Sequence, residues 1–344
     1  MSAAQPASPY RLFVGVDIAA KTFTATWMAP GGNPMRPLTF EQTSQGFASL
    51  QARLLATCPA PAEILVVMEA TGSYWIALAT TLAHAGFRVS IVNPAQAHAF
   101  AKALLKRAKT DAIDAQTLAR LAALLQPAPW TPPPAIYLEL QQRLVQRDAL
   151  IGLRQQVRNQ RHALLQAPTI VASVRERMEC LLVSLDAQIA AIERELKEVI
   201  HLDASWAASA RLLLSIPGVG LLTAAWLLVS TLNFSLGATP EQLAAYAGLA
   251  PMVHASGTSV RDRPRIGHSG NGRLRTALYL ATLSATRHNP RIRAFYLRLC
   301  AAGKPKKVAR CAAARKLLHL AWAIARKGIP FDPAYASQLH PAAA

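Results

Sequence analysis

Short apolar runs in the first third of the chain are separated by amphipathic segments, which predicts strands followed by helices. Residues 11–19 (RLFVGVDIA) and 64–70 (ILVVMEA) are almost continuously apolar, and each contains one acidic residue close to its end. Residues 88–92 form a third apolar run, whereas residues 22–28 and 38–43 alternate between apolar and polar side chains. Continuous runs are typical of strands that are buried on both faces, and alternation is typical of half-buried strands.

Helical segments separate or follow these strands. They are predicted at residues 45–56 and 73–85, and from Pro94 onward in one helix that reaches Asp111 and Asp114. The order strand–strand–strand–helix–strand–helix–strand–helix predicts an α/β domain over residues 11–128, in which helices cover both faces of a mixed sheet. Residues 1–10 are expected to form a disordered tail.

A proline-rich segment, QPAPWTPPP at residues 126–134, interrupts this pattern and predicts a domain boundary. Apolar residues in the helical region after it recur in alternating steps of four and three, as in a coiled coil. This seam consists of Met178, Leu182, Leu185, Ile189, Ile192, Leu196 and Val199. A weaker stripe, Leu150, Leu153, Val157 and Leu164, precedes a turn at Ala167 and Pro168. An antiparallel helical hairpin is therefore expected, packed either within one chain or between protomers.

The positive charge is concentrated in the last part of the chain. The formal net charge is +19 at pH 7, and residues 206–344 carry 18 basic residues against three acidic ones. So basic a surface favours a polyanion, and nucleic acid is the expected partner. The most apolar segment, residues 212–234, contains Pro217 and glycines that would leave backbone groups unsatisfied in lipid, so no membrane partner is expected.

The remaining composition indicates a cytoplasmic, nucleoid-associated protein. We expect no signal peptide, because residues 1–10 lack a basic region followed by an apolar one. The cysteines show neither metal-ligand nor redox spacing and are expected to be reduced thiols; they are Cys58, Cys180, Cys300 and Cys311. The sequence contains neither a P-loop nor a dinucleotide-binding motif.

Four carboxylates are the strongest candidates for chemistry. Asp111 and Asp114 share one helix face, a spacing that by itself is more typical of a solvated helix. Asp17 and Glu69 each stand at the carboxyl end of an apolar strand, where ligands gather in α/β sheets. An ionised carboxylate there needs a cation, hydrogen bonds or exposure to water. Together the four predict a divalent-cation site of the kind used in two-metal phosphodiester chemistry.

Two motifs in the basic region point to phosphate. LLSIPGVGLLTA, residues 213–224, is a helix-hairpin-helix signature in which Gly218 and Gly220 let backbone N–H groups approach a phosphate, although a structural turn is the alternative. The loop at residues 251–275 holds Ser256, Ser259 and Ser269, any of which can be a nucleophile; the residues alone favour a phosphate-binding loop. The further candidates for nucleic-acid binding are Lys102, Lys106, Arg107, Lys109, Arg261, Arg263, Arg265, Asn271, Arg273 and Arg275.

These motifs, in this order, resemble those of the DEDD transposases of bacterial insertion sequences, relatives of the Piv-type DNA invertases that include RNA-guided recombinases. In the N-terminal part the resemblance rests on VGVDIA around Asp17, MEATGSYW around Glu69, VNPAQAHAFAKA, and KTDAIDAQTLA around Asp111 and Asp114. In the C-terminal part it rests on SIPGVGLLTAAWLL, LAAYAGLAPMVHASGT and GHSGNGRLRTALYLA. The resemblance covers nearly the whole chain.

The resemblance implies a RuvC-like, ribonuclease-H-type fold for residues 11–128, with a metal-binding tetrad of Asp17, Glu69, Asp111 and Asp114. The expected cofactor is Mg²⁺, two ions per site, with Mn²⁺ as the substitute. Residues 129–205 would be a coiled-coil connector, and residues 206–335 a mainly α C-terminal domain with Ser256 of HASGT as its catalytic serine, followed by a tail at 336–344. The implied partners are double-stranded donor and target DNA, an element-encoded guide RNA, and a homodimer that assembles into a synaptic tetramer.

The expected function is therefore that of a transposase, in which Ser256 attacks a scissile phosphate beside the tetrad. In a synaptic assembly of this kind, one protomer's carboxylates would work with another's serine. The alternative is a metal-dependent, junction resolvase-like nuclease in which activated water attacks and Ser256 binds phosphate. A covalent protein–DNA adduct separates these two. A third interpretation, a non-catalytic nucleic-acid-binding protein, predicts that Asp17→Ala leaves activity intact.

Overall fold

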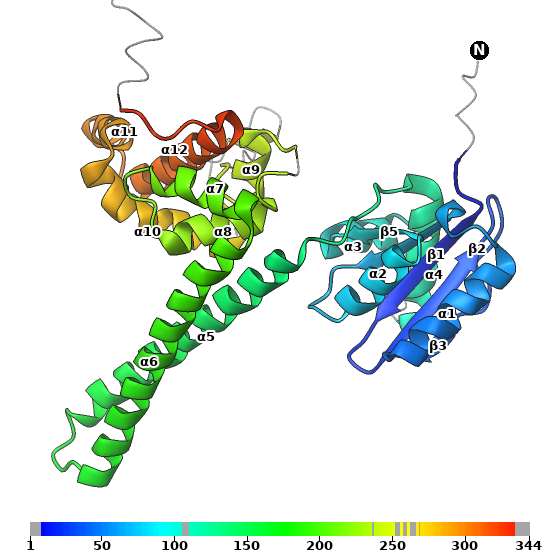
Figure 1. The fold of residues 1–344 in the computed structure, drawn as a ribbon, viewed down its shortest axis with the longest axis horizontal. Coiled ribbons are helices and arrows are strands. Elements are labelled where there is room, and N and C mark those ends of the chain that lie inside the picture. The colour runs from blue at the N-terminus through cyan, green and yellow to red at the C-terminus, as the bar shows by residue number, and fades with distance from the viewer. Residues whose placement is uncertain are drawn as a thin grey trace, which may run out of the picture. The chain divides into compact units, whose positions relative to one another are not determined.

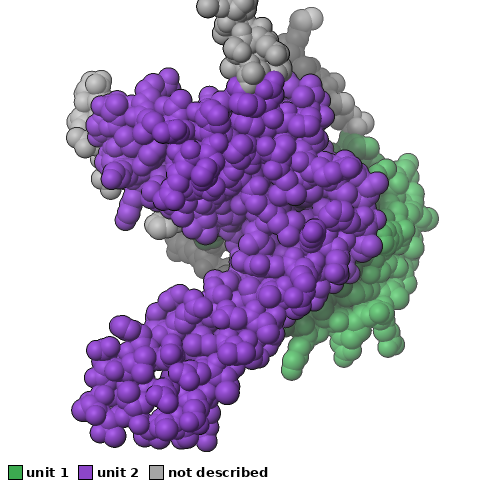
Figure 2. Space-filling model, turned by 60° about the vertical axis from the view of Figure 1, so that its left-hand side comes forward, with its two compact units in different colours: residues 1–132 green, residues 133–344 purple. Residues whose placement is uncertain are grey.

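The computed structural model describes residues 8–104, 110–235, 237–251, 255–256, 260–261, 266–267 and 269–333, with backbone alone at 255–256 and 260–261. The chain divides into two compact units, residues 1–132 and 133–344, which are coloured separately in Figure 2. None of the helices in the described part of the chain is long and apolar enough to cross a membrane.

Unit 1 is built on a five-stranded mixed sheet with the order β3-β2-β1-β4-β5 (Figure 1). The strands are β1 (Leu12–Ile18), β2 (Thr22–Met28), β3 (Leu38–Glu41), β4 (Ile64–Glu69) and β5 (Arg88–Val92). The first three form an antiparallel meander, whereas β1, β4 and β5 are parallel. The predicted α/β class and the mixed sheet are confirmed.

Helices cover both faces of this sheet, as the continuous apolar runs predict. They are α1 (Ser44–Thr57), the short 3₁₀ helix η1 (Pro61–Glu63), α2 (Trp75–His84), α3 (Pro94–Ala103) and α4 (Asp111–Leu125). Val14 and Val16 of β1 belong to a core with residues of α1 and α2. Phe13, on the opposite face of the same strand, belongs to a core with residues of α3 and α4. Alternate residues of β1 therefore point to different helix pairs.

The prediction of one helix from Pro94 through Asp114 is wrong. Helix α3 ends at Ala103, and α4 begins at Asp111 after the N-cap residue Thr110. The Thr110 hydroxyl accepts a hydrogen bond from the backbone N–H of Ile113 at 3.3 Å, so its side chain satisfies one of the N–H groups that a new helix leaves unpaired. Asp111 and Asp114 consequently lie in the first turn of a separate helix.

Unit 2 begins with a self-packed hairpin of α5 (Ala135–Leu164) and α6 (Ala172–Leu202), which extends from a helical body in Figure 1. Arginines of α5 pair with acids of α6, including Arg147 with Glu193 at 2.7 Å and Arg154 with Asp186 at 2.7 Å. The seam residues Leu185, Ile189, Ile192, Leu196 and Val199 are buried, and Met178 and Leu182 are half-buried. The prediction fails at Leu153, which is 50% exposed on the outer side of α5.

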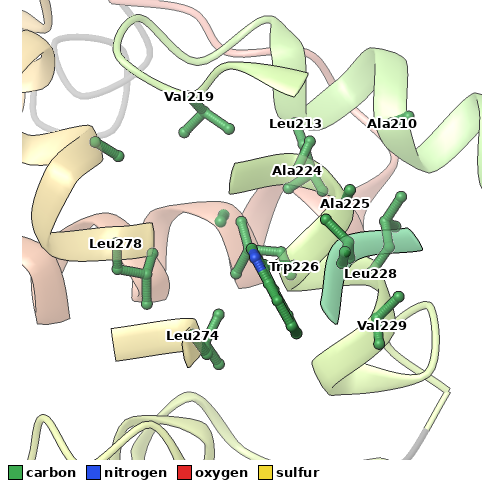
Figure 3. Packing of buried hydrophobic residues seen from close by; sticks show 14 of the residues in the cluster. Ala210, Leu213, Val219, Ala224, Ala225, Trp226, Leu228, Val229, Leu274 and Leu278 are labelled. Carbon is green, nitrogen blue, oxygen red and sulfur yellow. The ribbon is translucent and has the colours of Figure 1, made fainter. Parts of the chain in front are cut away.

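The body of unit 2 is helical and shares one core with the base of the hairpin. Its elements are α7 (Ala204–Leu214), α8 (Leu221–Thr231), α9 (Pro240–Tyr246), β6 (Ala255–Ser256), β7 (Val260–Arg261), α10 (Gly272–His288), α11 (Pro290–Ala301) and α12 (Lys306–Lys327). Figure 3 shows Trp226 of α8 with Leu274 and Leu278 of α10 on one side of its ring. Helix α8 is buried along almost its whole length, which explains why its sequence is so apolar.

Candidate active site at the carboxyl ends of β1 and β4

Two of the four carboxylates stand next to each other at the carboxyl end of the sheet. The parallel register of β1 and β4 places Val16 opposite Met68, so Asp17 and Glu69 follow at the same level. Val16 and Met68 pack into the core formed with α1 and α2. Because successive side chains of a strand alternate between faces, Asp17 and Glu69 point to the other face, which α4 covers.

The other two carboxylates lie at the N-terminus of α4. Asp111 is exposed and Asp114 is half-buried in the first helical turn. The Asp114 N–H donates to the Thr110 carbonyl oxygen at 2.9 Å, which closes that turn. Acidic residues at this end of a helix are favoured by the partial positive charge of its free N–H groups. The sequence therefore places both acids where the helix itself stabilises them.

Gly15 allows α4 to approach β1 closely enough to bring these carboxylates together. A Cβ atom at Gly15 would lie 2.1 Å from the Ala115 carbonyl oxygen and 2.2 Å from the Ala119 nitrogen. Both neighbours are helix backbone, which cannot rotate away. Gly15 lies two residues before Asp17, and Ala115 directly follows Asp114. Direct packing of the helix on this glycine therefore fixes the distance between the two pairs of acids.

The carboxylates interact electrostatically across the two elements. Burial, together with the negative charges of Asp114, Asp111 and Glu69, raises the pKa of Asp17 to about 6, and a hydrogen bond from the Ile18 backbone acts in the opposite direction. A carboxyl group whose neighbours disfavour its charge is suited to a bound cation. Within the described part of the chain, no three His, Cys, Asp or Glu side chains already converge on one point as metal ligands would.

Two further features of this site were missed by the sequence reasoning. The Thr71 hydroxyl donates to Oε1 of Glu69 at 2.8 Å and so orients that carboxylate. An open, polar hollow beside Asp111 is lined by Thr24, Pro37, Thr39, Thr110 and Ala112. The signal for Thr71 is its place two residues after Glu69 in a turn. For the hollow, whose lining comes from two strands and a helix, the sequence carries no signal.

Several predicted site residues lie in or near parts of the chain that the structure does not describe. Ser256 is in β6, where its backbone pairs with Val260, and Arg261 in β7 pairs with Ala255. Their side chains fall outside the description, as do the residues Lys106, Arg107, Lys109, Arg263 and Arg265. Lys102 is exposed in the last turn of α3.

The two glycines of the helix-hairpin-helix motif differ in their surroundings. Gly218 has a φ of +99°, and a Cβ there would lie 2.5 Å from the Ala285 Cβ and 2.6 Å from the Ala285 nitrogen. The Asn289 side chain donates to the carbonyl oxygen of Pro217 at 3.4 Å, next to this contact. Gly218 therefore makes room for α10, which agrees with the structural-turn alternative. Gly220 is exposed, precedes α8, and has open space where a Cβ would lie.

Asn271 and Arg275 make contacts within the protein. Asn271 accepts a hydrogen bond from the Leu274 N–H at 3.1 Å and so caps α10. Its amide group also donates to the Ser230 hydroxyl at 3.3 Å and to the Tyr246 hydroxyl at 3.2 Å. Arg275 donates to the Ser269 carbonyl oxygen at 3.0 Å. Both residues hold the end of the serine-containing loop in place.

Arg273 is exposed and lies over the ring of Trp226, 5.7 Å from its centroid. Burial raises the pKa of Asp148 in α5, and the charges of Arg273 and Arg147 partly offset this. Arg273 is thus held between an aromatic ring and an acid of the same unit. Its exposed part remains accessible to a partner.

Comparison with known proteins gives matches along most of the chain. A sequence model described as transposase matches residues 14–168, and a model of the IS116/IS110/IS902 transposase family matches residues 210–297. A pilin gene-inverting protein of Moraxella bovis is 34% identical over 325 residues, which cover 94% of this chain and 98% of that protein. Its counterpart in Moraxella lacunata is 33% identical, with coverage of 94% and 98%. The transposase for insertion sequence element IS1328 of Yersinia enterocolitica is 23% identical, with coverage of 94% and 99%.

Proposed function

Because this chain belongs to the IS116/IS110/IS902 family of transposases, we propose that it recombines DNA with a carboxylate tetrad and a serine nucleophile. Family membership makes it an enzyme that acts on DNA by recombination. The observation that supports the finer proposal is geometric: Asp17 and Glu69 end neighbouring parallel strands, and the first turn of α4, with Asp111 and Asp114, belongs to a helix that packs directly on Gly15. The charges of Asp114, Asp111 and Glu69 also add to burial in raising the pKa of Asp17. The sheet order is consistent with a RuvC-like, ribonuclease-H-type domain.

The four carboxylates fit a divalent cation by their chemistry. Carboxylate oxygens are the ligands that Mg²⁺ and Mn²⁺ take, and positive charge would offset both the burial and the repulsion that raise the pKa of Asp17. Asp17, Glu69, Asp111 and Asp114 would hold the ion or ions, with Thr71 orienting Glu69. Bound there, Mg²⁺ would offset negative charge on the scissile phosphate and on the oxygen that leaves it.

Ser256 is proposed to form a covalent link to DNA. Its Oγ would attack the phosphorus, a new P–O bond would form, and the bond to the deoxyribose oxygen would break. The serine hydroxyl loses its proton in this step, and the departing oxygen gains one to become a free hydroxyl. Attack by a free DNA hydroxyl on the phosphoserine then rejoins the strands and restores the serine. The energy of the phosphodiester bond is retained, so no nucleotide cofactor is needed.

We further propose that each part of the chain has the role that the resemblance to this family implies. Residues 11–128 would supply the carboxylates, 129–205 the helical connector, and 206–335 the serine and most of the basic surface. A guide RNA encoded by the element would select donor and target DNA by base pairing. Two protomers would form a dimer and two dimers a synaptic tetramer, in which one protomer's carboxylates work with another's serine. The basic excess of residues 206–344 supports nucleic-acid binding by this part.

Trapping the covalent adduct tests the proposed reaction. The protein is incubated with Mg²⁺, labelled donor and target DNA, and RNA transcribed from the non-coding flanks of its element. A denaturing gel then compares wild type with Ser256→Ala, Asp111→Ala and the control Ser49→Ala, a serine on the exposed side of α1. We expect a protease-sensitive shifted band that is lost in Ser256→Ala and Asp111→Ala and kept in Ser49→Ala. Cleavage without an adduct, unchanged in Ser256→Ala, would instead establish the water-dependent nuclease.

A further inference from the structure

Two adjoining hollows lie along α12 in unit 2 (Figure 1). One lies between α12 and α11, which contact each other, and the other lies between α12, Phe295 of α11 and residues before and after the serine loop. Each has a volume of about 580 Å³, and both are lined by Phe295, Lys316 and His319. Arg298 completes one hollow, and Lys307 and Arg315 complete the other. We refer to these six residues together as the α11–α12 groove. None of the described residues that line it is acidic.

Phe295 lies beside two positive charges that form no ion pair in the part of the chain that the structure describes. The Arg298 guanidinium is 5.4 Å and the Lys316 ammonium 5.8 Å from the centroid of its ring. These distances are close to the outer limit of about 6 Å for a cation–π contact, so the contacts are weak and easily exchanged. Among the described residues, neither cation has a carboxylate within ion-pair distance. A phosphate would offset the mutual repulsion of these two side chains.

His319 lines both hollows but adds no positive charge to them. Its Nε2 atom is buried and has no hydrogen-bond partner among the residues that the structure describes. Burial lowers the pKa of His319, and the charges of Arg315 and Lys316 lower it further against the opposing charge of Glu241. The ring is therefore neutral at neutral pH, with one nitrogen that donates and one that accepts. A neutral ring of this kind suits the edge of a base better than a phosphate.

The groove has an apolar side that reaches the serine loop. Leu249, Pro251, Ile266 and Val308 line the same hollow as Lys307 and Arg315, and Val308 is 53% exposed. Pro251 and Ile266 flank, in the sequence, the β6–β7 hairpin that contains Ser256. A molecule bound in the groove would thus lie at the base of that hairpin.

We propose that the α11–α12 groove binds a single-stranded segment of nucleic acid, with a base stacked on Phe295 and neighbouring phosphates on Arg298, Lys316 and Arg315. A duplex keeps its bases inside and presents phosphates on a convex surface, so it cannot use an aromatic ring within a groove. A single strand can, because each base has a face that stacks on an aromatic side chain while cations follow its backbone. The inference rests on the proposed function, and it adds a site that holds an unpaired strand close to the serine loop.

Fluorescence anisotropy with the full chain tests this inference. The probes are labelled dT20, rU20 and a 20-base-pair duplex of mixed sequence. We expect Phe295→Leu, which keeps an apolar side chain but removes the ring, to weaken single-strand binding about fivefold or more and duplex binding by less than about twofold. The double variant Arg298→Gln, Lys316→Gln should reduce the slope of log K against log salt for a single strand by about 1.4, the value for two phosphates. The control is Arg194→Gln, Lys197→Gln, which removes two exposed charges from α6.

The outcomes separate this inference from the proposed reaction, because binding requires no catalysis. If Phe295→Leu weakened single-strand and duplex binding equally, or weakened neither, the proposed binding site in the groove would be refuted. The proposal of a serine adduct would be unaffected. A missing adduct would overturn the reaction and leave the groove standing. Stronger wild-type binding to rU20 or to dT20 would identify RNA or DNA as the preferred strand. If Phe295→Leu does not fold, ultraviolet cross-linking of bromodeoxyuridine DNA to wild type decides: cross-linked peptides that include none from α11 or α12 would refute the site.

Discussion

Replacing Gly15 by alanine should separate the two halves of the carboxylate site. The new Cβ would lie 2.1 Å from the Ala115 carbonyl oxygen, whereas ordinary contact begins at 3.4 Å. Helix α4 would therefore have to retreat by more than an ångström, since neither the strand nor the helix backbone can rotate. This movement would carry Asp111 and Asp114 away from Asp17 and Glu69.

The free-energy cost of Gly15→Ala depends on the atoms that the new Cβ would meet. Overpacking of a core typically costs about 1–3 kcal/mol, and more where nothing can yield. Because a Cβ at Gly15 would meet backbone atoms of three residues of α4, we expect the substitution to cost at least about 3 kcal/mol. A displacement of about 1 Å among reacting groups can cost about 100-fold in rate. Any Gly15→Ala protein that folds should therefore have recombination activity reduced by about that factor.

Hydrogen exchange measured by peptide locates the effect, because it reports on each unit separately. We expect faster exchange in peptides from β1 and α4 and no change in peptides from α10–α12. Gly152→Ala is the matched control: Gly152 is in the interior of α5 with open space at its Cβ position, so alanine should stabilise the hairpin by up to about 1 kcal/mol. Wild-type exchange and activity in Gly15→Ala would refute the argument that this glycine sets the position of α4.

Three other variants test the surrounding contacts. The pKa of Asp17 is about 6 in the folded protein, against 3.8 in the unfolded chain. The contribution of Asp17 to the free energy of unfolding is therefore fully present below pH ~4 and is lost as the pH rises through 6. After allowance for partial exposure this loss is about 1–2 kcal/mol, and urea titrations should show it in wild type but not in Asp17→Asn. Thr71→Ala should weaken Mn²⁺ binding about tenfold, with Thr57→Ala unchanged; equal binding would deny Thr71 its orienting role. Asn271→Ala should lower the free energy of unfolding by about 2–3 kcal/mol, since it removes a cap and two hydrogen bonds, and a loss below about 0.5 kcal/mol would contradict that account.

The strands of the sheet and the positions of Asp17 and Glu69 were predictable from the sequence, because both follow from the pattern of apolar residues along each strand. The apolar runs before Asp17 and Glu69 imply buried parallel strands, and parallel strands place their carboxyl ends at one edge. The same periodicity places both acids on the α4 face. By contrast, the division between α3 and α4 depends on one capping threonine, Thr110, which local composition does not distinguish from a residue within a helix.

The roles of individual glycines and polar residues could not be predicted in the same way. Gly218 and Gly220 occupy one motif, yet Gly218 accommodates α10 and Gly220 has open space. A glycine in a motif indicates that a side chain does not fit at that position. The sequence does not identify the neighbouring group that leaves no room for it. Asn271 stands among arginines in sequence, but its partners Ser230 and Tyr246 are 41 and 25 residues away. Only the fold shows that its hydrogen bonds are internal.

Divalent-cation binding tests most directly whether the four carboxylates form one site. Mn²⁺ titration followed by electron paramagnetic resonance can be done without nucleic acid on wild type, Asp17→Asn, Glu69→Gln, Asp111→Asn and Asp114→Asn. The matched control is Glu63→Gln. Glu63 lies at the opposite end of β4, and its carboxylate forms an ion pair with Arg11 at 3.2 Å. We expect Mn²⁺ binding in wild type and Glu63→Gln, and weaker binding in each of the other four variants. Binding that remains unchanged in Asp17→Asn and Asp111→Asn would contradict the shared site on which the proposed chemistry depends.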